Sequence, residues 1–190
     1  MSLKVTFELA TADLDHFRRV MKDARAVAKN RGREEVIAGA GALLTSIESV
    51  EIPEFIRDRL ERIRSLIQMV QDEEWNLPEP EGSHVLNSLA YFCEPEDLIP
   101  DEVAGLGFLD DAIMVELVVR ELKHEIDAYH DFCSFRAARD AGDHDPVDRT
   151  EWLAARRQAL QSRMRNRRRR DRQRRRGGAG GGGRSPFSLF

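Results

Sequence analysis

The chain has 190 residues, 41% of them hydrophobic, which is enough for one domain of ordinary size with a packed core plus a tail. No apolar run approaches the roughly 18 to 20 residues that a membrane-spanning helix needs, and residues 1–15 lack the basic and apolar regions of a secretory signal, so we expect a cytoplasmic protein. Cys93 and Cys133 have no CxxC partner, which argues against a disulfide scaffold or a thiolate zinc site.

The net charge of −4 averages two very different parts of the chain. Residues 163–190 contain eleven arginines and one aspartate and carry +10, so residues 1–162 carry −14. Such a chain can fold its cationic end onto its acidic body, or it can present that end to a phosphate-rich partner. The charges alone do not decide between these two arrangements.

The N-terminal segment is the one candidate strand. Residues 3–9 alternate apolar and polar side chains, which is the two-residue period of a strand with one buried face. A single strand leaves an unpaired edge. We therefore expect this segment either to pair with a second copy in a homodimer or to lie on the helices as an extended arm.

Three amphipathic helices are expected next. The first begins after Thr11, a good N-cap, and ends at Arg31-Gly32. A second apolar stripe covers residues 36–47, and a third covers residues 56–70, with Pro53 in the first turn of that helix. Each stripe is apolar on one face only, so the three helices need one another to bury these faces.

The next segment contains helix breakers. Residues 75–82, WNLPEPEG, predict a linker, after which Ser83 caps a helix over residues 84–92. From Asp111 onward, apolar residues recurring on one face predict a single long helix.

A glycine and a proline in residues 141–146 close that long helix, and a last helix from about Thr150 runs into the arginines. Residues 177–183 predict a flexible linker. The pattern thus predicts an all-α protein: a small helical bundle with one short N-terminal extended segment and an arginine-rich helical C-terminal extension. The expected divisions are residues 1–82, 83–145, 146–176 and 177–190.

The sharpest motif lies in residues 90–115, AYFCEPEDLIPDEVAGLGFLDDAIMV. A DLIPD block is followed, six residues after its last aspartate, by a GxLDDA block, and this pattern resembles the signature of the YkvA-like family, a bacterial domain of unknown function. The resemblance implies a domain but no reaction. It also implies a membrane link, because many relatives continue into a helix that is apolar enough to span. Here Glu116, Arg120 and Glu121 interrupt that helix, which argues against a spanning role.

The signature loop has two readings. Its aspartates could converge on a hard cation or act as a paired acid and base. Alternatively, prolines fix the backbone, glycines allow turns, and aspartates cap the following helix, so that these residues serve folding alone. The composition favours the structural reading. The candidate residues are Asp97, Pro100, Asp101, Gly107, Asp110 and Asp111.

Two histidines on the long helix share a face with other candidate metal ligands. His124 lies three residues before Asp127, and His130 lies three residues before Cys133. No HExxH pattern accompanies them, and one helix alone supplies too few ligands. We therefore expect neither a metal site nor a cofactor.

The arginine run RMRNRRRRDRQRRR has the clearest physical consequence. Guanidinium groups bind phosphate oxygens bidentately and keep their charge at any relevant pH, so the run predicts sequence-independent, salt-dependent binding to nucleic acid. It favours nucleic acid over the chain's own acidic body, and both over an anionic lipid surface. The candidate residues are Arg163, Arg165, Arg167, Arg168, Arg169, Arg170, Arg172, Arg174, Arg175 and Arg176.

The last residues form a candidate partner-binding peptide. Phe187, Leu189 and Phe190 follow a glycine-rich stretch and have no core to enter. The peptide is similar to the short Ser-Leu-Phe endings by which bacterial proteins bind the replication sliding clamp, although Pro186 and Phe187 replace the usual glutamine and leucine. The sequence as a whole favours a non-enzymatic interaction module. A metal-dependent enzyme and a peripheral membrane protein are the alternatives.

Overall fold

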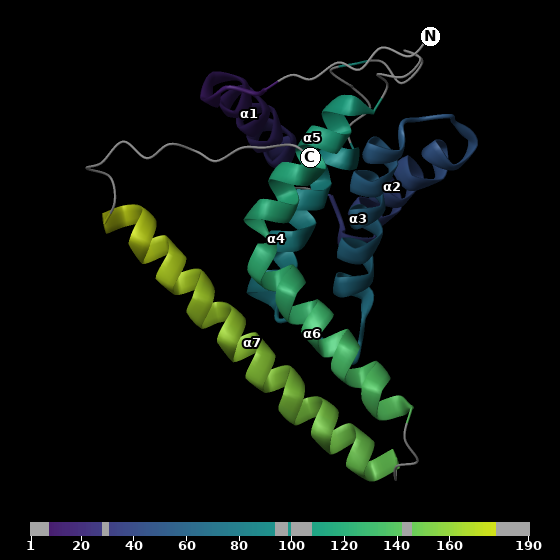
Figure 1. Ribbon diagram of the computed structural model, residues 1–190, viewed down its shortest axis with the longest axis vertical. Coiled ribbons are helices and arrows are strands. Elements are labelled where there is room, and N and C mark those ends of the chain that lie inside the picture. Colours follow the sequence, from purple (N-terminus) through teal and green to yellow (C-terminus); the bar gives the residue numbers. More distant parts are fainter. Residues whose placement is uncertain (1–7, 28–30, 94–98, 100–107, 142–145, 178–190) are drawn as a thin grey trace.

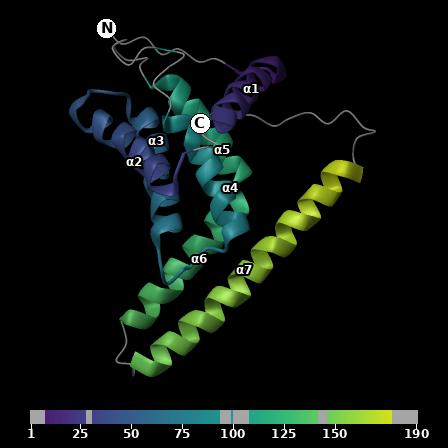
Figure 2. The same ribbon diagram turned by 180° about the vertical axis from the view of Figure 1, so that it is seen from behind.

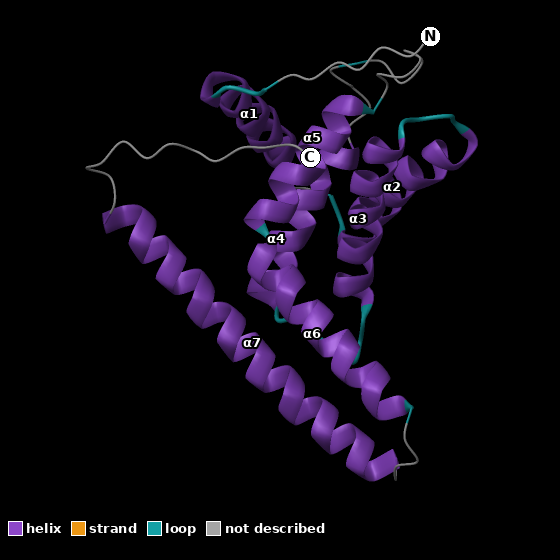
Figure 3. Ribbon diagram, in the orientation of Figure 1, coloured by secondary structure: helices purple, strands orange, loops and turns teal. Residues whose placement is uncertain are grey.

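The computed structural model describes residues 8–27, 31–93, 99, 108–141 and 146–177. These residues form helices joined by short connections, with no strand among them (Figure 3), which confirms the all-α prediction. Most of the candidate strand, residues 3–7, lies outside the described residues. The helices are α1 Thr11–Val27, α2 Arg33–Ser46, α3 Glu54–Gln71, α4 Glu79–Leu89, α5 Leu109–Glu121, α6 Lys123–Asp140 and α7 Pro146–Gly177, with short 3₁₀ turns η2 Ile47–Ser49 and η3 Ala90–Cys93.

The three N-terminal helices follow the predicted stripes. Their apolar faces supply buried side chains such as Met21 in α1, Ala40 in α2 and Leu60 in α3. Two details at the helix starts differ from the prediction. Thr11 is the first residue of α1 and not its cap, and the Asp13 carboxylate accepts the Ala10 N–H at 2.8 Å.

The predicted linker over residues 75–82 is wrong in its second half. Helix α4 begins at Glu79, with Pro78 as the preceding cap residue and Pro80 in the first turn. A proline fits there because the first turn of a helix has no use for its missing N–H. Ser83 is therefore not a cap; it lies inside α4 and donates its hydroxyl hydrogen to Glu79 Oε1 at 2.8 Å.

The predicted single long helix is in fact two. Helix α5 ends at Glu121, and α6 begins at Lys123 after Leu122, whose backbone angles are φ −94° and ψ 13°. The hydrogen-bond ladder continues across the break, since Leu122 N–H donates to Val118 O and Ile126 N–H donates to Leu122 O, both at 2.9 Å. The chain thus changes direction while these two hydrogen bonds bridge the break, and the apolar spacing continues through it, so the periodicity does not reveal two helices.

The last helix starts earlier than predicted. It begins at Pro146 and not near Thr150, and its 32 residues span about 48 Å at about 1.5 Å per residue. Gly177, predicted to open the linker, is its last residue. Residues 178–190, including the candidate peptide of Phe187, Leu189 and Phe190, lie outside the described residues.

The helices form a bundle from which one long hairpin projects. Helices α2 to α5 pack around a continuous core that includes Trp75, Phe108 and Phe132, each at most 1% exposed. Helices α6 and α7 lie side by side and antiparallel, and α7 runs along one edge of the molecule toward the end that carries α1 (Figures 1 and 2). The arginines therefore occupy the C-terminal half of a helix whose N-terminal half is packed on the body.

Candidate functional site

The aspartates of the signature open helix α5. Asp110 and Asp111 are buried, at 1% and 3% exposure, and Asp110 Oδ2 accepts the Ile99 N–H at 3.1 Å. Phe108, just before the helix, is buried with a left-handed backbone (φ 64°), a conformation uncommon outside glycine. The Asp110 contact is of the kind that the structural reading requires, because it ties the signature loop to the start of the helix.

The other signature residues, Asp97, Pro100, Asp101 and Gly107, lie outside the described residues. Within the described ranges, no three histidine, cysteine, aspartate or glutamate side chains are grouped so that they could hold a metal ion. His124, the first of the two candidate helix ligands, bonds through Nε2 to Asp171 Oδ2 at 2.8 Å. Its sequence neighbour Asp127 pairs with Lys123 instead.

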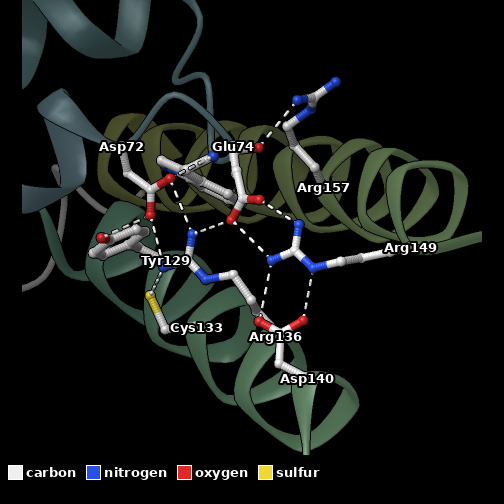
Figure 4. Close-up of polar contacts among 9 residues, drawn as sticks. Asp72, Glu74, Tyr129, Cys133, Arg136, Asp140, Arg149 and Arg157 are labelled. Carbon is white, nitrogen blue, oxygen red and sulfur yellow. Dashed lines mark hydrogen bonds and ion pairs between the residues drawn. The ribbon is translucent and has the colours of Figure 1, made fainter. Parts of the chain in front are cut away.

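A network of ion pairs holds the hairpin to the body (Figure 4). Arg136, from α6, reaches Asp72 Oδ2 at 2.9 Å and Glu74 Oε2 at 2.8 Å. Arg149, from the first turns of α7, contacts Glu74 Oε1 at 2.5 Å and Asp140 Oδ1 at 2.7 Å. We call Asp72, Glu74, Arg136, Asp140 and Arg149 the hairpin clamp. It joins the α3–α4 connection, α6 and α7.

The clamp residues influence one another's ionisation. The hydrogen bond to Asp72 raises the pKa of Arg136, and the bond to Glu74 adds to this. Burial alone would raise the pKa of Asp72, but the hydrogen bonds from Arg136 and from the Trp75 N–H outweigh it and lower that pKa. The clamp is thus a set of fixed, mutually satisfied charges and offers no poised acid or base.

Helix α7 then packs by an apolar seam that ends at Met164. Leu153, Leu160 and Met164 are each at most 5% exposed. Gln161 donates to Trp75 O at 2.9 Å, and Arg157 donates to Glu74 O at 3.0 Å, so the side chains of α7 satisfy carbonyl groups of the α3–α4 connection. Up to Met164, therefore, α7 is a structural part of the domain.

Beyond Met164, ion pairs tie the arginine run to the body, and two of them are close. Arg168 contacts Glu125 Oε1 at 3.0 Å, and Asp171 contacts His124. His84, from α4, hydrogen-bonds Glu125 at 3.3 Å. We call His84, Glu121, Glu125 and Arg168, together with the pair His124–Asp171, the arm latch. Its centre is Glu125, whose side chain is fully buried.

The second carboxylate of the arm latch is Glu121. His84 Nε2 lies 3.0 Å from Glu121 Oε1, and Arg25 from α1 lies 2.9 Å from Oε2. The hydrogen bond with His84 is the main reason that the pKa of Glu121 is lowered to about 2, with help from Arg25 against the cost of burial. Burial would lower the pKa of His84, but its bonds to Glu121 and Glu125 outweigh burial and raise it.

A cavity of about 630 Å³ opens beside the arm latch. Its walls come from α1, α4, the α5–α6 junction and α7, and they carry five cationic side chains against two carboxylates. The cationic residues are Arg18, Arg120, Lys123, Arg168 and Arg172. The sequence reading did not single out this site, since its residues are scattered over 155 positions.

Most of the predicted nucleic-acid residues are exposed. Arg168 is half-buried in the arm latch, and the side chains of Arg175 and Arg176 are outside the described set. Arg165 is exposed and lies 4.0 Å from Glu81. The exposed residues are Arg163, Arg165, Arg167, Arg169, Arg170, Arg172 and Arg174. Asp171, the single acidic residue of the run, was the one sequence signal that part of the run contacts the body.

The family model described as a protein of unknown function (DUF1232) matches residues 85–117, from α4 through most of α5. The "Uncharacterized membrane protein YkvA" of Bacillus subtilis (strain 168) is 32% identical over 76 residues, which cover 37% of this chain and 70% of that relative. No solved structure matches. None of the helices in the described ranges is long and apolar enough to cross a membrane. The signature loop, the matching family model and the extent of the match to YkvA agree: the chain belongs to the YkvA-like family of unknown function.

Proposed function

We propose that this protein is a non-enzymatic interaction module that uses the C-terminal half of α7 to bind nucleic acid without sequence preference. One observation carries the proposal: seven arginines of residues 163–174 are exposed on a helix whose other half is packed into the domain core. A helix held in this way has its backbone ordered before binding, so only the entropy of the arginine side chains is lost when they meet phosphates.

The charge surrounds most of the helix. Successive residues point about 100° apart, so the run Arg167 to Arg170 covers every direction around the axis. One of these directions, that of Arg168, is taken by the body through Glu125. The remaining arginines face solvent, where they can contact phosphates of one or both strands of a duplex.

The run offers no means of reading bases by stacking. Residues 163–176 contain no aromatic side chain, and the one large apolar residue, Met164, is buried against the body. Affinity would therefore come from phosphate contacts and counterion release. The expected signature is weak dependence on sequence and strong dependence on salt.

A membrane surface is the second candidate, because the relative from Bacillus subtilis bears the words "membrane protein" in its name. The arginine run lacks an apolar face that could enter the acyl region, so binding would rest on attraction to anionic headgroups. A cytoplasmic protein that docks on such headgroups fits both the name and the described helices.

The C-terminal peptide would add partner choice to this nonspecific affinity. Phe187, Leu189 and Phe190 would dock in the groove of a protein such as the replication clamp. Deleting residues 186–190 is then expected to abolish that docking and to leave nucleic-acid affinity within about twofold, because the deletion removes no arginine.

The test is a salt series with a nonspecific DNA duplex and a single-stranded RNA, each about 20 nucleotides long. A variant with Arg167, Arg169 and Arg170 changed to Ser should lose about 2.7 units of the slope of log affinity against log salt on duplex DNA. The control changes Arg19, Arg62 and Arg64, exposed on α1 and α3, to Ser and thus removes the same charge.

The proposal holds if the control keeps its slope and the α7 variant loses it. It fails if the full chain shows no binding at low salt, or if both variants lose affinity equally. Flotation of the same proteins with phosphatidylglycerol vesicles separates the second candidate. Binding to vesicles without binding to either nucleic acid would assign the arginines to the membrane surface.

A further inference from the structure

The cavity beside the arm latch is a concave site between four parts of the bundle. Its volume of about 630 Å³ is in the range of small-molecule sites. Arg18 of α1 lines it from one side and Arg172 of α7 from another, with Arg120 and Lys123 at the α5–α6 junction. In both ribbon views α1 lies at the end of the molecule toward which α7 runs (Figures 1 and 2).

The charge of this cavity is opposite to that of the body around it. Residues 1–162 carry −14, yet those of them that line the cavity include three cations and one carboxylate, and α7 adds Arg168 and Arg172 against Asp171. Clustered like charges repel one another and are stabilised by a counterion of opposite sign. A basic cavity in an acidic body therefore indicates an anionic ligand.

The five cations of the cavity are not all neutralised by carboxylates of the protein. Arg168 pairs with the fully buried Glu125, and Arg120 pairs with Glu116, whose side chain is 19% exposed, while Lys123 makes only an exposed pair with Asp127. Arg18 pairs with Asp15 only on the exposed face of α1, with more than half of each side chain in contact with water. Arg172 makes no hydrogen bond or ion pair with any described residue. Arg18 and Arg172 are therefore the cations most able to take up a ligand.

We propose that this cavity binds a phosphate group, with Arg18 and Arg172 as its principal contacts. The planar guanidinium group donates two parallel hydrogen bonds to a phosphate, and two such groups from separate helices can hold one phosphate between them. The phosphate can belong to a soluble phosphate ester or to a lipid headgroup. In either case the ligand links α7 to α1 and strengthens the attachment that the arm latch already provides.

This site shares Arg172 with the proposed nucleic-acid surface but is otherwise built from different residues. Arg169 and Arg170 do not line the cavity, whereas Arg172 and Arg18 do. The two proposals can therefore fail independently, because one concerns a saturable site for a small anion and the other a salt-sensitive surface for a polymer.

The first measurement is calorimetric titration of the full chain with inorganic pyrophosphate at low salt. We expect saturable binding to one site. The double variant Arg18→Ala with Arg172→Ala should weaken it by roughly tenfold or more, because two charge-assisted contacts are lost. The control is Arg19→Ala with Arg64→Ala, which removes two charges at exposed positions outside both the cavity and the arginine run. Its affinity should stay within about twofold.

A second arm identifies the source of the phosphate. Flotation with phosphatidylglycerol vesicles is repeated with and without pyrophosphate. If pyrophosphate releases the wild-type chain from the vesicles but does not release the cavity variant, the lipid headgroup occupies the cavity. If the chain binds pyrophosphate but does not bind the vesicles, the ligand is a soluble phosphate. The proposal is overturned if neither probe binds saturably, or if the control loses as much affinity as the cavity variant. Unchanged melting temperatures of both variants exclude misfolding as the cause.

Discussion

The two halves of α7 are one continuous helix, yet they relate to the rest of the protein in opposite ways. Up to Met164 the helix carries an apolar seam, and its polar side chains satisfy carbonyls and carboxylates of the body. Beyond Met164 the seam stops, and most of the charged side chains point into solvent. The apolar stripe thus determines which part of α7 packs on the domain. The charge of the remaining part determines which ligands it can bind.

The two ion-pair networks show the same contrast. The hairpin clamp joins three segments through two arginines that each contact two carboxylates. The arm latch holds the second half through fewer contacts, of which Arg168 with Glu125 is the most buried. The first half of α7 should therefore be essential to the fold. The second half is held by ion pairs whose arginines can also bind anions from solution.

The largest effect on stability should come from the seam itself. Leu160 is 1% exposed and packs in the core, so Leu160→Ala leaves a cavity and should lower the free energy of unfolding by about 2 to 5 kcal/mol. Chemical denaturation monitored by circular dichroism measures this. Gln158→Ala, an exposed neighbour on the same helix, is the control and should change stability by less than about 0.5 kcal/mol. Equal losses would mean that the first half of α7 is not a packed part of the domain.

A smaller loss should follow when the hairpin clamp is broken. Arg136→Ala removes the cation shared by Asp72 and Glu74, and it should cost about 2 to 3 kcal/mol because two carboxylates lose charged partners. Arg139→Ala is the control on the same helix, since Arg139 is exposed and stacks on Phe135 and Trp152. A loss in Arg139→Ala as large as that in Arg136→Ala would refute a specific role of the clamp.

The helices could be predicted from the sequence, whereas these ion-pair networks could not. Periodicity predicted α1 to α3 and the seam of α6, because each helix buries the stripe that its own sequence contains. The clamp could not be predicted in this way: Arg136 is 64 residues from Asp72, and Arg149 is 75 residues from Glu74. Such pairs depend on how the helices are arranged, and no local pattern records that.

The predictions of two helix boundaries were wrong for different physical reasons. Pro78 and Pro80 predicted a break, but proline is also accepted at the start of a helix, so the same residues begin α4. At Leu122 the opposite occurs, because the hydrogen bonds and the apolar spacing continue while the axis changes direction. Of the candidate site residues, seven arginines of the run are exposed to solvent, as a charged run on a helix predicts. The cavity and the arm latch form only where separate segments of the chain come together, so no local pattern predicts them.

The arm latch should contribute less than the hairpin clamp, and its contribution should depend on pH. Arg168→Ala leaves the buried Glu125 without that cation and should cost about 1 to 2 kcal/mol near neutral pH. In the folded protein burial raises the pKa of Glu125, but His84 and Arg168 outweigh it and lower the pKa below its usual value. Stability from such a group is present above its unfolded pKa and is lost as the pH falls through its folded pKa. The difference between wild type and variant should therefore shrink in acid. Arg169→Ala, an exposed neighbour, should show neither effect.

The smallest expected effect is the contribution of His84, which bonds to two carboxylates and lies near the charge of Arg168. Glu121 and Glu125 hold its pKa above the usual value in spite of burial and of the Arg168 charge, while Arg25 contacts Glu121 from α1. A raised histidine pKa stabilises the fold below the unfolded value of about 6.5, and this stability is lost as the pH rises through the folded pKa. Melting temperatures of wild type and His84→Gln should therefore differ most at pH 6 and converge toward pH 8.5. A difference that stayed constant with pH would show that His84 acts through packing alone, and the arm latch would then hold the second half of α7 by Glu125 and Arg168 without any contribution from protonation.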